Sequence, residues 1–445
     1  MSDNREKYIA IPVLLILWFS GFIFPSAVPM VMIGMTLVSI RLIVLFRNVQ
    51  PVFMFYIFHL TYVVLLIPFF IYDIPITGHS EFQTAKYMDS TLLIHGAFVY
   101  SLYFFSDLNI PDRPIIFSQN LPKRSDKAIF LLLVCIMLAI IINMWSGSVN
   151  IYAIDADQGW STYTENISGT SGVSEYFLIF FLTAFIFAKK NSSKRILAAI
   201  FILFTYVAFT IGMRVTLVMP VLLLFALFMD GKIKTRYIFI MSIIGMMLVQ
   251  AAGLLRDGKR ALVELFTIYG GTQMLTNQGE VFYTSNVIVS AIIDGLCGVK
   301  ERAFSLLAAS LQVILPPRFG LGSEGKPAIY VWNLTERAAG GGGLISTFFY
   351  FWLDYFGVVL IAFFIAMVTN KAIKKPTPLL SIYIICLYSF SPRWLAYDPV
   401  NFLFRLPLYA IGLYLILMHI KKTMSRPSLA EDGDRMQALQ PGATH

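Results

Sequence analysis

Arginines stand within or at the ends of several long apolar runs, where few carboxylates accompany them. Arg214 lies in the apolar stretch IGMRVTLVMP, and Arg256 follows another apolar run in LLRDGKR. Arg405 falls inside the last apolar run of the chain. A guanidinium group is planar and always charged, and it binds two phosphate oxygens at once. Because a charge inside an apolar run is costly, these residues predict a site for an anionic, phosphate-bearing ligand.

Other candidate residues lie in turns rich in proline and glycine. Arg318 follows two prolines in LPPRFG, Arg337 precedes four consecutive glycines, and Arg393 lies in SPRWLAYDP. The glycines, which include Gly341 and Gly342, lead into a long apolar run. Glycines there let an anionic group approach bare backbone N–H groups at a helix N-terminus, which favours negative charge. We therefore add these residues to the predicted binding site.

Each of these positions also has a structural interpretation. Arg214 can snorkel from a tight connection to lipid headgroups, and Arg256 can anchor a helix end at the membrane surface. The turn around Arg318 fits an ordinary linker, and the glycines fit a flexible joint. A metal site is not expected, because the five histidines form no H-E-x-x-H or similar pattern. The sequence also lacks a G-x-S-x-G motif and a P-loop, so soluble-enzyme mechanisms are excluded.

The composition indicates what must position these residues. Of the 445 residues, 58% are hydrophobic and only 13% are charged, against about 25% charged in soluble domains. Many apolar runs approach the roughly 20 residues that cross a bilayer. We expect an all-α polytopic membrane protein of about twelve transmembrane helices, with spans at 8–24, 27–46, 51–72, 89–106, 128–145, 174–188, 196–212, 214–229, 237–254, 344–369, 377–394 and 399–419.

The positive charges predict the orientation of these spans. The net charge of +9 would suggest nucleic acid in a soluble protein, but here the basic residues gather in short loops on one side. Both termini are therefore expected in the cytoplasm, with the first helix uncleaved. The chain divides into helices 1–9 over 1–254, a large periplasmic loop with short helices over 255–343, helices 10–12 over 344–423, and a disordered cytoplasmic tail over 424–445.

The order of the motifs resembles the bacterial O-antigen and oligosaccharide repeat-unit polymerases (Wzy-type). The likeness covers residues 200–415 and rests on IGMR, LLRDG, NQGEVFY, LPPRFG and GGGGLISTFFYFWLDYFGVVL, with Arg393 and Arg405 near the last helix. IGMR departs from the family in having Met213 where a small polar residue is frequent. Residues 255–343 contain no histidine, which disfavours the related O-antigen ligases because those carry one in the corresponding loop.

The resemblance implies a GT-C-like membrane glycosyltransferase that works at the periplasmic face of the inner membrane. Such enzymes transfer a growing glycan from its polyprenyl diphosphate to a sugar hydroxyl of the next lipid-linked unit. It implies polyprenyl-diphosphate-linked glycans as donor and acceptor, membrane lipids around the helices, and a chain-length-determining co-polymerase as partner. No nucleotide sugar, metal or other cofactor, and no nucleic acid, is expected.

The resemblance also assigns roles to the candidates. Arg214, Arg256, Arg393 and Arg405 are expected to bind the diphosphates, and Arg318 and Arg337 to act as loop clamps beside Gly341 and Gly342. Glu280, in NQGEVFY, is the first candidate for the base that accepts the hydroxyl proton, and Asp398 is the second. Two alternatives stay open: an O-antigen ligase, and a flippase or transporter of lipid-linked oligosaccharides. A transporter is disfavoured because the predicted charges gather at one face and the chain shows no internal repeat.

Overall fold

The structure is a computed structural model that describes residues 3–64, 85–122, 124–146, 148–150, 173–256, 277–315, 324–337 and 342–424. Every regular element in these ranges is a helix, which confirms the predicted all-α class. Six of the described helices are long and apolar enough to cross a membrane. Five shorter apolar helices accompany them, so the count of twelve spans and the periplasmic placement of 255–343 stay predictions.

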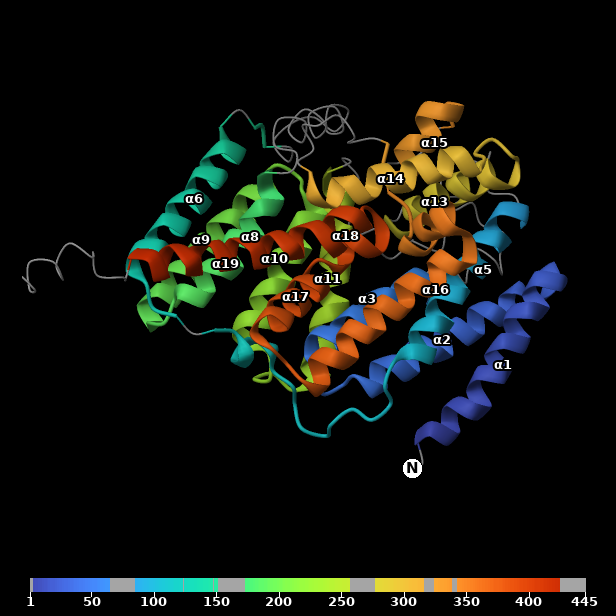
Figure 1. The fold of residues 1–445 in the computed structure, drawn as a ribbon, viewed down its shortest axis with the longest axis horizontal. Coiled ribbons are helices and arrows are strands. Elements are labelled where there is room, and N and C mark those ends of the chain that lie inside the picture. The colour runs from blue at the N-terminus through green and yellow to red at the C-terminus, as the bar shows by residue number, and fades with distance from the viewer. Residues whose placement is uncertain are drawn as a thin grey trace, which may run out of the picture.

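One group of helices is built around the broad contact between α5 (Ala85–Phe105) and α16 (Ile345–Lys374). Three N-terminal helices complete this group: α1 (Asp3–Ile23), α2 (Val28–Leu45) and α3 (Gln50–Val64) (Figure 1). Gly34 lets α2 approach α5 closely, because a Cβ there would lie 2.3 Å from the hydroxyl oxygen of Tyr100. That hydroxyl donates a hydrogen bond of 2.9 Å to the Val31 carbonyl, so a polar contact closes the packing.

A second group lies at the other end of the long axis in Figure 1. It contains α6 (Lys127–Trp145), α8 (Val173–Phe187), α9 (Asn191–Thr210), α10 (Arg214–Leu224) and α19 (Leu406–Met424). Phe177 of α8 and Phe204 of α9 stack with ring centroids 3.8 Å apart. Between the groups run α11 (Thr235–Arg256), which packs on α3, and α17 (Pro378–Ser389), which packs on α19. Aromatic and aliphatic packing therefore holds the bundle together.

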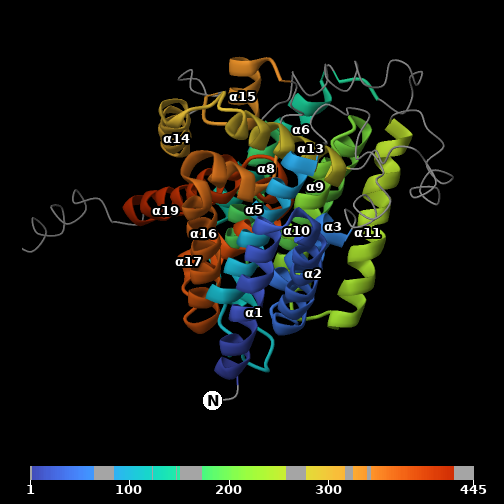
Figure 2. The same ribbon diagram turned by 90° about the vertical axis from the view of Figure 1, so that its right-hand side faces the viewer.

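The described residues between 277 and 335 form three helices at the end of the bundle far from the N-terminus (Figure 2). These are α13 (Asn277–Ile293), α14 (Val299–Ile314) and α15 (Pro327–Thr335). The amphipathic pattern of this segment predicted short helices, and α14 and α15 fit that description. However, α13 is mostly buried and packs on α5 and α16, so it belongs to the core of the bundle.

Several of the apolar runs expected as single helices are interrupted in the described part of the chain. α16 has non-helical torsions at Leu353 and at Asp354, whose φ is 53°. The run 377–394 splits into α17 and α18 (Ser391–Ala396), where Pro392 begins the second helix. The last run begins as a π-helical turn, η6 (Val400–Arg405), which continues directly into α19. Non-helical backbone within the hydrocarbon layer of a membrane is tolerated where it is buried in protein or lines a cavity.

Arg302 of α14 stabilises the break in α16. Its guanidinium group donates hydrogen bonds to the carbonyl oxygens of Tyr350 and Phe351, and its Nη2 lies 2.8 Å from the Asp354 Oδ1. The arginine thus binds carbonyls in the turn before the break, and its charge offsets that of the carboxylate at the strained residue. One side chain therefore ties the outer helix α14 to the bundle.

Candidate functional site

A chain of polar contacts joins α8, the start of α15 and η6. The Lys326 Nζ lies 2.9 Å from the Asp398 Oδ2, and the backbone N–H of Asn401 donates to the Asp398 Oδ1 at 3.0 Å. The side-chain amide of Asn401 donates to the Glu175 Oε2 at 3.0 Å. Elements distant in sequence thus bring two carboxylates and a lysine together, and we name Glu175, Lys326, Asp398 and Asn401 the carboxylate cluster.

The electrostatics of this cluster favour a permanently charged lysine. The carboxylate of Asp398 raises the pKa of Lys326 above its usual value, and Glu175 contributes in the same direction. Burial of Lys326 and the charge of Arg393 oppose this rise, but they are outweighed. Asp398 contacts the Lys326 ammonium through one carboxylate oxygen and the Asn401 N–H through the other. The lysine thus places a positive charge directly beside this carboxylate.

Arg393 lies on α18 and brings a second cation to the carboxylate cluster. Its guanidinium carbon lies 5.2 Å from the ring centroid of Tyr397 and 5.7 Å from that of Phe402. Its Nε is buried and has no hydrogen-bond partner. Cation–π contacts hold the guanidinium in place without using its N–H groups, so a donor remains for a ligand.

Arg405 is the last residue of η6 and is only 6% exposed. Its Nε donates to the Tyr409 hydroxyl at 3.4 Å, and its guanidinium carbon lies 5.6 Å from the centre of that ring. The Nη2 is buried without a hydrogen-bond partner. π-helical turns inside α-helices occur frequently at functional sites. Arg393 and Arg405, which we name the arginine pair, thus both keep an unpaired buried donor.

Gly342 packs the loop before α16 onto α18. A Cβ at this position would lie 2.4 Å from the Tyr397 Cδ1 and 2.9 Å from the Ala396 carbonyl oxygen. The Leu344 N–H, at the start of α16, donates to the Ser285 hydroxyl at 2.9 Å. The prediction that Gly342 opens this helix terminus to a ligand is therefore not supported. Ala396 and Tyr397 fill the space beside Gly342, and Ser285 already accepts the Leu344 N–H. Gly341 lies outside the described residues.

Arg337 belongs to a separate ionic group that ties α15 to α13 and α5. Its Nη2 lies 3.0 Å from the Asp294 Oδ2, and its Nη1 donates to the Ser290 hydroxyl at 2.7 Å. Asp294 also binds Lys86 and the Tyr87 hydroxyl. Partial burial opposes ionisation of Asp294, but these hydrogen bonds outweigh it and hold the pKa below its usual range. We infer a structural latch here, rather than the predicted clamp on a diphosphate.

The remaining predicted residues are placed less completely. Arg214 is the first residue of α10 and Arg256 the last residue of α11, and their side chains lie outside the described part. α10 packs on α18, which brings the helix of Arg214 beside that of Arg393. Glu280 lies in the first turn of α13 with an exposed side chain. Arg318 lies outside the described residues.

Three residues of the carboxylate cluster, Glu175, Lys326 and Asn401, had no place in the sequence-based site. Glu175 carries the signal that singled out Arg256, namely a charge at the edge of an apolar run, and this signal was overlooked. Nothing in its own sequence marks Asn401. The structure pairs one of the predicted cations with a carboxylate, since Arg337 meets Asp294, and it also pairs Lys326 with Asp398. Within the described part, the buried guanidinium nitrogens without a hydrogen-bond partner belong to the arginine pair.

A buried pair of histidines lies in the first group of helices. The Nε2 atoms of His59 (α3) and His95 (α5) are 3.2 Å apart, and both side chains are almost fully buried. The second ring nitrogen of His95 lies 3.1 Å from the Ser346 hydroxyl. Because 36 residues separate the two histidines along the chain, no sequence motif reveals the contact. In the described part of the chain, no three His, Cys, Asp or Glu side chains gather as they would around a metal ion.

Comparisons of the chain with protein-family models, with curated proteins and with solved structures found no match. The resemblance to repeat-unit polymerases thus rests on the chain's own motifs. The function is argued below from the arginine pair and the carboxylate cluster.

Proposed function

We propose that this protein is a membrane glycosyltransferase that polymerises oligosaccharide repeat units carried on polyprenyl diphosphate, as O-antigen polymerases do. The observation that carries the proposal is the arginine pair, which keeps two buried guanidinium nitrogens without protein partners. Burying a donor of a charged group without a partner is costly. Each such donor is suited to an anion, and a diphosphate offers several oxygens to each guanidinium.

In the proposed reaction, a sugar hydroxyl of the incoming unit attacks the anomeric carbon of the growing chain. The bond from this carbon to the diphosphate oxygen breaks, and a new glycosidic bond forms. Arg393 and Arg405 stabilise the negative charge that grows on the leaving diphosphate. The hydroxyl proton passes to a carboxylate. Of the two predicted bases, Asp398 is better supported than Glu280, because the carboxylate cluster places it on the turn that joins α18 to η6.

The experiment that tests this proposal replaces Arg405 by methionine in the native strain. Loss of the unpaired buried donor should abolish long polysaccharide and leave glycan of a single repeat unit on electrophoresis. Replacing a buried unpaired charge by an apolar side chain of similar length should leave stability unchanged or raise it. An equal or higher melting temperature together with loss of polymer would therefore separate a functional role from a folding defect. Arg393→Met should give the same loss of polymer.

A matched control is Arg195→Met, at an exposed arginine in the first turn of α9. This variant should give a normal polysaccharide ladder. The glycan pattern also separates the alternatives, because loss of a flippase removes the repeat unit altogether and loss of a ligase leaves polymer on its lipid carrier. A normal ladder in both Arg393→Met and Arg405→Met would refute the proposed role of the arginine pair.

A further inference from the structure

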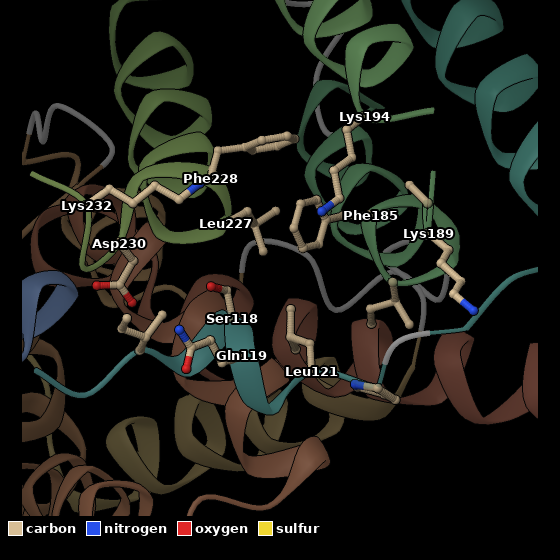
Figure 3. A pocket seen from close by; sticks show the side chains of 14 residues that line it. Ser118, Gln119, Leu121, Phe185, Lys189, Lys194, Leu227, Phe228, Asp230 and Lys232 are labelled. Carbon is tan, nitrogen blue, oxygen red and sulfur yellow. The ribbon is translucent and has the colours of Figure 1, made fainter. Parts of the chain in front are cut away.

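A pocket of about 230 Å³ is lined in part by the loop between α5 and α6 and by the loop before α11. These loops lie at the end of the bundle away from α14 and α15 (Figure 2). The pocket lies between the short 3-10 turn η2 (Phe117–Asn120), the end of α8, the start of α9 and the π-helical turn η4 (Phe225–Met229) (Figure 3). Apolar side chains form part of its wall, whereas its charged groups are Lys189, Lys194, Asp230 and Lys232. This volume falls below the usual 300–1,000 Å³ of small-molecule sites, so the pocket suits a small polar headgroup.

Asp230 is buried in the wall of this pocket with no partner for its carboxylate. The residue is 4% exposed, and neither oxygen has a hydrogen-bond partner. Burial raises the pKa of the carboxyl group to about 7, and the nearby N–H groups of Phe117 and Gly231 oppose that rise. A buried carboxylate that lacks a partner destabilises the fold. Its retention therefore calls for a ligand that supplies the missing hydrogen-bond donor.

The backbone around Asp230 fixes the carboxylate in this position. Its own N–H donates to the Phe225 carbonyl at 2.9 Å. Gly231 has a φ of +74°, and a Cβ there would lie 2.3 Å from the Ile116 Cδ1. The Gly231 N–H donates to the Gln50 Oε1 at 2.8 Å. These contacts fix the backbone of the turn that carries Asp230 beside the pocket.

The lysines around the pocket are also without carboxylate partners in the described part of the chain. The Lys194 Nζ lies 5.5 Å from the ring centroid of Phe185. Lys194 and Lys232 extend from opposite sides toward the part of the pocket lined by Leu227, whereas Lys189 points away (Figure 3). The pocket therefore presents both signs of charge without pairing them, so it suits a ligand that carries both.

We propose that this pocket binds the headgroup of a phospholipid with a primary amine, of the phosphatidylethanolamine type. Lys194 and Lys232 bind the phosphate, and Asp230 accepts hydrogen bonds from the ammonium group. Basic pockets between transmembrane helices on the cytoplasmic side are known lipid-headgroup sites, and the positive charges predict that this end faces the cytoplasm. A phosphatidylglycerol headgroup can donate from its hydroxyls but brings no positive charge to Asp230, and a choline headgroup has no N–H to donate. The inference is independent of the proposed function, so each can fail alone.

The test is native mass spectrometry of the full chain, stripped of lipid and then mixed with phosphatidylethanolamine, phosphatidylcholine and phosphatidylglycerol of identical acyl chains. The wild-type protein should retain phosphatidylethanolamine in preference to the other two. Asp230→Asn should weaken retention of phosphatidylethanolamine about tenfold, the effect of losing one charge-assisted hydrogen bond, and leave phosphatidylglycerol unchanged. Lys194→Gln combined with Lys232→Gln should weaken both lipids. Equal retention of the ethanolamine and choline lipids by the wild type would overturn the proposal.

Matched controls separate the pocket from general surface charge. Lys190→Gln combined with Arg195→Gln removes two exposed cations that do not line the pocket, and it should leave lipid preference unchanged. Free O-phosphoethanolamine should displace the bound lipid, and inorganic phosphate should not. Equal displacement by the two soluble compounds would overturn the role of Asp230. A direct pair of Asp230 with Lys232 predicts a different result. The single variants Asp230→Asn and Lys232→Gln would then lose equal stability and leave the lipid preference unchanged, and this result would overturn the proposal.

Discussion

Asp230→Asn should change how the stability of the protein depends on pH. The folded carboxyl group has a pKa of about 7, against an ordinary value of 3.8. Between these values the folded chain holds a proton that the unfolded chain has lost, so stability falls as pH rises. Each unit of difference corresponds to about 1.36 kcal/mol. Ionisation of Asp230 therefore opposes folding by about 2 kcal/mol at pH 5 and by about 4 kcal/mol at pH 8.

The assay is thermal unfolding of the lipid-stripped protein in detergent, followed by tryptophan fluorescence between pH 5 and pH 8. Between pH 5 and pH 8 the free energy of unfolding of the wild type should fall by about 2–3 kcal/mol more than that of Asp230→Asn. The comparison of pH slopes cancels any cost of the new amide that does not depend on pH. Asp294→Asn is the control: the pKa of Asp294 is held low, so its contribution is constant across this range.

Parallel curves for wild type and Asp230→Asn would refute this reasoning. They would mean that the carboxylate of Asp230 reaches water or a cationic partner in the folded protein. Added phosphatidylethanolamine should reduce the difference between the two proteins at pH 8, because a bound ammonium group favours the ionised carboxylate. The wild type and Asp230→Asn therefore serve in both experiments, the pH dependence of stability and the binding of lipid.

Two further predictions concern the carboxylate cluster and the loop before α16. Lys326→Met should lower the melting temperature by leaving the buried Asp398 without a counter-charge, and adding Asp398→Asn should recover part of the loss. The coupling in a double-mutant cycle should be about 1–2 kcal/mol, since Lys326 is partly exposed, and a value of zero would mean that solvent screens the pair. Gly342→Ala should lower the melting temperature and the amount of polymer, because the new Cβ overlaps Tyr397; an unchanged protein would show that the loop can shift away.

The helical content of the chain follows from its sequence, but the breaks in its helices do not. Apolar runs with basic residues at their ends mark α6, α9 and α11, because such runs are stable in a membrane only as helices. Pro392 gives a local reason for the break between α17 and α18. By contrast, FWLDYFG contains no residue that demands a break at Asp354. That break depends on Arg302, which lies 52 residues earlier in the chain.

The sequence predicts only part of the candidate site, because it reveals local features and not contacts between distant helices. Arg393 and Arg405 were found because a cation in an apolar run is conspicuous whatever its neighbours. Their partners depend on contacts between helices, and no local pattern reveals that Lys326 meets Asp398 or that Asn401 meets Glu175. The excess of cations, read from the sequence as evidence for an anionic ligand, was therefore overstated for some residues. It stays a sound argument for the arginine pair.

The break in α16 also has a consequence for the evolution of this chain. Arg302 and Asp354 form one structural unit, although they lie on different helices. Replacing Asp354 leaves the partly buried Arg302 without its counter-charge, and replacing Arg302 leaves the strained Asp354 without its stabilising contact. The two positions should therefore change together among related sequences. Glycine at position 354 is the exception that we expect, because it adopts a positive φ at little cost. A set of related sequences can thus report whether the broken helix is inherited, before any of their structures is solved.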